Sequence, residues 1–198
     1  MIDIILLKQQ ISALEKAGKR IPIYTLLREK WSKEADRPQL ALLVIQQMVF
    51  FLIDLEGPPI PIEQEDEYEL YHSFLQEALQ YGMKHCLHDK MFLWQMCYFL
   101  EGDATYHFLY GETIPEKSVD AIKEELYALS RRYFPESKLF TLILPIMQID
   151  YLYLQSIGKH DRLMIAEELS QWKLQSNAVD DDLKELFEDI VSDISSQT

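Results

Sequence analysis

Glycine and proline are scarce in this sequence: six glycines and eight prolines are spread over 198 residues. Many-stranded sandwiches and barrels need turn-forming residues between most of their strands, so the scarcity argues against these folds. No stretch alternates apolar and polar residues for long enough to form a sheet. The composition therefore predicts a mostly helical protein with long helices and short connections.

Cysteine is also scarce. The two cysteines, Cys86 and Cys97, lie among apolar neighbours, which is typical of reduced thiols and not of a disulfide framework. The first residues include an acid, Asp3, and lack both a basic region and a small-residue cleavage site, so they do not resemble a signal peptide. We therefore expect a cytoplasmic protein.

Long uninterrupted apolar runs are missing too. The best candidate, residues 40–53, is interrupted by Gln46 and Gln47 and ended by Asp54. It falls short of the roughly 18 to 20 apolar residues that cross a bilayer. A second run, residues 139–154, contains Pro145, Gln148 and Asp150. We expect both runs to be helices buried on most sides in a protein core, and we expect no membrane association.

Basic residues are few relative to acids. Lysine and arginine total 19 against 33 aspartates and glutamates, giving a formal net charge of −14. Phosphate backbones and anionic membranes repel such a protein, so nucleic acid is not an expected partner. The imbalance is uneven, because residues 41–103 hold two basic and eleven acidic side chains whereas residues 1–40 hold eight and five.

Apolar residues recur at spacings of three and four along most of the chain, which predicts amphipathic or buried helices. The expected helices cover residues 4–17, 24–33, 38–55, 63–88, 91–100, 115–133, 138–157, 161–173 and 183–194. We expect a single all-α domain over residues 1–198, an irregular bundle of about nine helices arranged as antiparallel helical hairpins. The sequence has no convincing repeat period, so a repeat-like arrangement stays open.

Gly18 is expected to end the first helix, and Ile21 and Pro22 to form a connection before the second. Three later helices are expected to be capped at their starts by Asp89, Ser137 and Asp161. In the helix over residues 63–88, the inner stripe includes Tyr68 and Tyr71, and Gly82 marks either close packing or a bend.

The densest acidic run follows a proline-rich stretch and is interleaved with tyrosines. This run is a candidate docking face for a basic protein. Its carboxylates would speed the encounter with the partner, and its tyrosines would supply binding energy. Alternatively, the acids only complement the macrodipole of a helix start and keep it soluble. The candidate binding residues are Glu63, Glu65, Asp66, Glu67, Tyr68, Glu69 and Tyr71.

Metal and catalytic patterns are incomplete. Glu69 and His72 have the Glu-x-x-His spacing of di-iron bundles, but no second such motif occurs. His85, Cys86 and His88 form a small cluster that lacks a full set of zinc ligands. Neither a Gly-x-Ser-x-Gly motif nor a glycine-rich phosphate loop is present. We expect no catalytic residue, metal or cofactor.

These observations favour a non-enzymatic interaction module whose acidic surface binds and masks a basic protein partner. A concrete version is an immunity or antitoxin-like inhibitor, because nucleic-acid-cleaving toxins need cationic clefts that a small acidic protein can block. Two alternatives stay open. One is a helical-hairpin scaffold or adaptor that binds a peptide in an apolar groove, and the other is an enzyme with a metal or small-molecule site. The sequence does not predict the oligomeric state.

Overall fold

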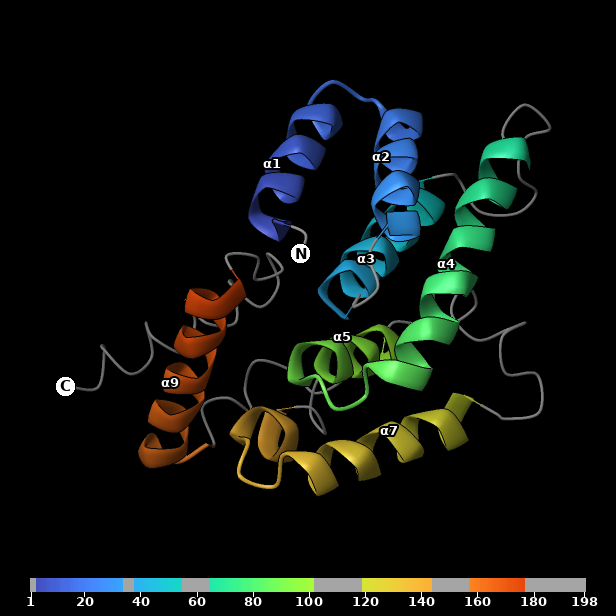
Figure 1. Ribbon diagram of the computed structural model, residues 1–198. Coiled ribbons are helices and arrows are strands. Elements are labelled where there is room, and N and C mark those ends of the chain that lie inside the picture. The colour runs from blue at the N-terminus through green and yellow to red at the C-terminus, as the bar shows by residue number, and fades with distance from the viewer. Residues whose placement is uncertain (1–2, 34–37, 55–64, 102–118, 144–156, 177–198) are drawn as a thin grey trace. The chain divides into compact units, whose positions relative to one another are not determined.

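The structure is a computed structural model that describes residues 3–33, 38–54, 65–101, 119–143 and 157–176 (Figure 1). Every regular element in these ranges is helical, which confirms the all-α prediction. The elements are α1 (Ile4–Glu15), α2 (Arg20–Lys33), α3 (Pro38–Asp54), α4 (Glu65–His85), α5 (Lys90–Glu101), α7 (Val119–Tyr133), the π-helical segment η2 (Leu139–Ile143) and α9 (Lys159–Ser176).

The chain divides into two compact units, residues 1–126 and 127–198, and the boundary falls inside α7. The first unit contains α1 to α5, in which α1 packs on α2 and α3 packs on α2, α4 and α5. The second contains η2 and α9. The total of about nine helices, their arrangement as hairpins and the single domain stay predictions. The helix expected at residues 183–194 lies outside the described residues.

The two ends of α1 are fixed by local hydrogen bonds. At its start the Asp3 carboxylate accepts the Leu6 amide at 3.0 Å. At its end the Gly18 amide donates to the Glu15 carbonyl at 2.8 Å, and the Lys19 amide donates to the Leu14 carbonyl at 3.0 Å. This is a Schellman arrangement, in which Gly18 adopts the left-handed conformation with φ of 65°. The predicted stop at Gly18 is confirmed.

The second helix begins earlier than predicted. It starts at Arg20, although Pro22 was expected to belong to a connection before the helix. A proline in the first turn costs little, because the amide that it lacks would have no partner inside the helix. Ile23, Leu27 and Trp31 then form the buried stripe of α2.

Helix α3 is buried on most of its surface, as predicted. It runs beside α4 (Figure 1), and Phe51 on α3 lies with its ring centroid 5.0 Å from that of Tyr71 on α4. Gln46 is half-buried, and its amide nitrogen donates to the Gln95 side chain of α5 at 3.2 Å. In the part of the chain that the structure describes, no helix combines the length and apolar character needed to cross a membrane.

Helices α4 and α5 meet at a glycine. Gly82 is buried on α4, and a Cβ atom placed on it would lie 2.2 Å from Cζ of Phe92 on α5. The sequence left open whether Gly82 marks a bend or a close packing contact, and the structure shows a close contact. A turn after His85 separates the helices, and Asp89 caps α5 by accepting the Phe92 amide at 2.9 Å. The predicted cap at Asp89 is confirmed.

In the second unit, two carboxylates of α9 bind the residues at the start of η2. Ser137 caps η2 by accepting the Phe140 amide at 3.4 Å, as predicted. Glu168 of α9 accepts a hydrogen bond from the Ser137 hydroxyl and bonds from the Lys138 and Leu139 amides at 3.1 and 3.4 Å. Asp161 was expected to cap α9, but α9 begins at Lys159, and the Asp161 carboxylate instead pairs with Lys138 at 3.0 Å.

Candidate binding surface

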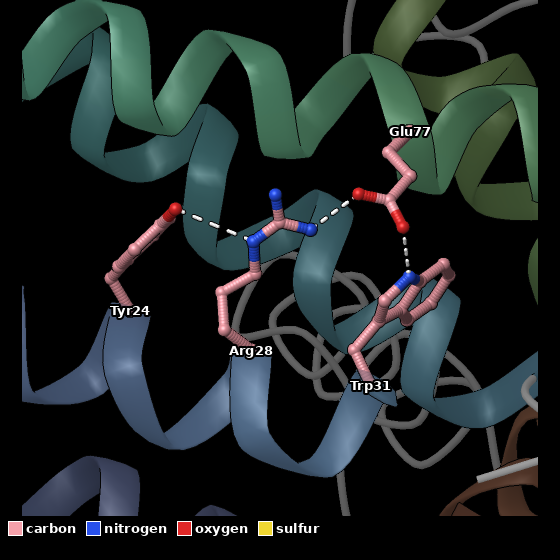
Figure 2. A network of polar contacts seen from close by, with 4 residues as sticks. All are labelled: Tyr24, Arg28, Trp31 and Glu77. Carbon is pink, nitrogen blue, oxygen red and sulfur yellow. Dashed lines mark hydrogen bonds and ion pairs between the residues drawn. The ribbon is translucent and has the colours of Figure 1, made fainter. Parts of the chain in front are cut away.

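Helix α4 carries the candidate surface, and a polar network holds the middle of this helix against α2. One Glu77 oxygen pairs with the Arg28 guanidinium of α2, and the other accepts the Trp31 indole N–H at 2.6 Å. Nε of Arg28 donates to the Tyr24 hydroxyl at 3.3 Å. Figure 2 shows these side chains bridging the two helices. A single carboxylate therefore anchors two donors of α2.

Aromatic contacts surround the same network. The Arg28 guanidinium lies 4.2 Å from the ring centroid of Phe74, within the range of a cation–π interaction. The rings of Tyr24 and Trp31 both pack edge-on against Phe74, at 5.7 and 5.8 Å. Desolvation, the largest single effect, lowers the pKa of Arg28, but the hydrogen bonds to Glu77 and Tyr24 and the charges of these two groups together outweigh it and raise the pKa. The network therefore holds this side of α4 toward α2.

Replacing Glu77 with alanine is expected to lower the free energy of unfolding by about 1 kcal/mol. Hydrogen bonds to charged groups contribute roughly 1.5 to 3 kcal/mol, but the side chains of Arg28 and Glu77 are 35% and 46% exposed, so solvent screens the pair. The measurement is urea denaturation of the wild type and the variant. The matched control is Glu29→Ala, which removes an exposed pair with Lys33 within α2, and it should leave stability unchanged. Equal losses in the two variants would contradict an anchoring role for Glu77.

Three of the predicted acids face solvent. Glu65, Asp66 and Glu69 are exposed on the first turns of α4. Among the described residues, no cationic group lies within ion-pairing distance of any of the three. Glu63, another of the predicted acids, lies outside the described residues. We call Glu65, Asp66 and Glu69 the acidic face.

Glu67 and Tyr71 turn inward. The Tyr71 side chain is fully buried, and its hydroxyl donates to a Glu67 carboxylate oxygen at 3.0 Å. Its ring lies 5.0 Å from that of Phe51 and 5.9 Å from that of Tyr24, between α3 and α2. Tyr71 therefore belongs to the core and supports α4 from within, and Glu67 is half-buried beside it.

Alkaline pH is expected to weaken the fold through Tyr71. Burial, followed by the hydrogen bond and charge of Glu67, raises the pKa of Tyr71 well above its ordinary value near 10. A raised folded-state pKa means that this contribution to stability is complete below about pH 10 and is lost as the pH rises further. The measurement is the difference in unfolding free energy between the wild type and Tyr71→Phe from pH 8 to pH 11. Above pH 10 the free energy of unfolding of the wild type should fall relative to that of Tyr71→Phe. A difference that stays constant with pH would contradict the raised pKa.

Tyr68 and His72 form a stacked pair on the flank of α4. Their ring centroids are 5.6 Å apart and their planes differ by 9°. Both side chains are half-buried, and Nε2 of His72 lies 3.4 Å from the amide nitrogen of Gln76. Of the two predicted tyrosines, Tyr68 is therefore the one that reaches the surface beside the acidic face.

The residues considered for metal binding do not come together. His72 contacts Tyr68 and Gln76, and His85 contacts the ring of Tyr81 at 4.9 Å. Cys86 and Cys97 are buried and are not joined in a disulfide. In the described ranges, no group of three or more histidine, cysteine, aspartate or glutamate side chains is arranged to hold a metal ion.

We compared the chain with known families, curated proteins and solved structures. Nothing in any of the three matches it. The assignment of the candidate surface therefore depends only on the geometry and charge of α4.

Sequence reasoning did not identify the Arg28, Trp31 and Glu77 network. Glu77 lies 49 residues from Arg28 and 46 from Trp31, and no motif links the three in the sequence. The available signal was weak: Tyr24, Arg28 and Trp31 recur at spacings of four and three, which places them along one side of a helix.

Proposed function

We propose that this protein is a non-enzymatic interaction module that binds and masks a basic protein partner through the acidic face of α4. The observation that carries the proposal is the exposure of Glu65, Asp66 and Glu69 without a neutralising cation among the described residues. Unpaired carboxylates keep their full field in solvent, so they can steer a cationic partner and then pair with it.

Two further observations support the same surface. The net charge of −14 extends the attraction beyond the face itself. The Glu77 network and the buried Tyr71 fix α4 against α2 and α3, so the carboxylates are presented on a rigid helix. A pre-organised face loses less conformational entropy on binding than a mobile one.

The specific form that we propose is an immunity or antitoxin-like inhibitor. An enzyme that cleaves nucleic acid needs a cationic cleft for its substrate, and carboxylates spaced along one helix can occupy such a cleft. In this proposal the protein works in the cytoplasm, with Cys86 and Cys97 as reduced thiols, and needs no cofactor. Tyr68, beside the face, adds aromatic contact area.

The test is a charge reversal on the acidic face. The variant Glu65→Lys, Asp66→Lys, Glu69→Lys is expected to slow association with the partner by at least tenfold and to reduce the salt dependence of the rate, because rim charges act mainly on encounter. Thermal stability should change little, since the three side chains are exposed. The partner is captured from the native cell with the wild-type protein, identified by mass spectrometry and used in association kinetics across a salt series.

The matched control reverses three exposed glutamates elsewhere, Glu15, Glu124 and Glu136, which gives the same change in net charge. Under the proposal this control keeps most of the wild-type rate. If the association rate falls by the same factor in both variants, net charge and not the acidic face governs binding. If the association rate is unchanged in both variants, the acids are only a solvated helix start, and the proposal is wrong.

One observation favours the adaptor alternative. Phe50 and Ile53, on the last turns of α3, are 56% and 52% exposed, and large apolar side chains exposed together often mark a binding surface. In this alternative the helices form hairpins and a peptide docks on their apolar side. Binding that is insensitive to salt and lost on Phe50→Ser would favour the adaptor over the acidic inhibitor.

A further inference from the structure

No further inference is drawn: the strongest candidate, the exposed apolar pair Phe50 and Ile53 on the last turns of α3, carries nothing because no feature of the described part of the chain shows what covers it.

Discussion

Replacing Gly82 with alanine is expected to lower the free energy of unfolding by roughly 1 to 3 kcal/mol, the usual cost of overpacking a core. The added Cβ would lie 2.2 and 2.4 Å from two carbons of the Phe92 ring, closer than real Cβ contacts. Either the ring must move or α4 and α5 must separate. Alanine favours a helix over glycine by about 1 kcal/mol, so a net loss would show that the steric term dominates. The measurement is urea denaturation followed by circular dichroism.

The control for this prediction is Gly158→Ala, since no atom lies within 4 Å of a Cβ placed there. Gly158 stands at the start of α9, where its carbonyl accepts the Arg162 amide and alanine is a poorer cap than glycine, so the loss should stay below about 1 kcal/mol and below that of Gly82→Ala. A second test combines Gly82→Ala with Phe92→Leu, which shortens the facing side chain and should recover part of the loss. A Gly82→Ala variant as stable as the wild type would contradict the close contact between α4 and α5.

Replacing Tyr71 with alanine is expected to lower the free energy of unfolding by about 3 to 5 kcal/mol, the cost of removing a large aromatic side chain from a core. Tyr71 is 0% exposed and packs against rings from both α2 and α3. Domains have total free energies of unfolding of about 5 to 15 kcal/mol, so the expected loss is a large fraction of the whole stability. The measurement is the midpoint and slope of chemical denaturation.

Two variants separate the causes of that loss. Tyr71→Phe keeps the ring and removes only the hydroxyl that donates to Glu67, so it should cost about 1 kcal/mol. Tyr68→Ala should cost less than Tyr71→Ala, because Tyr68 is only half-buried. If Tyr68→Ala proves as costly as Tyr71→Ala, the assignment of Tyr71 to the core and Tyr68 to the surface is wrong.

Much of the local structure could be predicted from the sequence, because its causes are local. Spacings of three and four identified the helices, and the stops and caps at Gly18, Asp89 and Ser137 depend on residues within one turn. The errors are local too. Pro22 lies in the first turn of α2 and not in the expected connection, and Asp161 pairs with Lys138 instead of capping α9.

The candidate surface was predictable only in part. A helical spacing placed both Tyr68 and Tyr71 on the inner stripe of α4; Tyr71 is buried there, whereas Tyr68 is only half-buried. The inward turn of Glu67 depends on the Tyr71 hydroxyl, and the two rings around Tyr71 come from other helices. Periodicity gives the direction of a side chain about its own helix, but it does not give the identity of the neighbouring helix. For that reason the Glu77 network also escaped prediction.

The Glu168 contacts in the second unit affect the order of events during synthesis. Ser137 is made about thirty residues before Glu168, so the first turn of η2 is synthesised before its carboxylate partner exists. During that interval water must satisfy the Lys138 and Leu139 amides. Since chains grow by roughly 5 to 20 residues per second, the turn waits for seconds, a long time on the scale of helix formation. The start of η2 therefore reaches its final hydrogen bonding only after the first half of α9 has been translated.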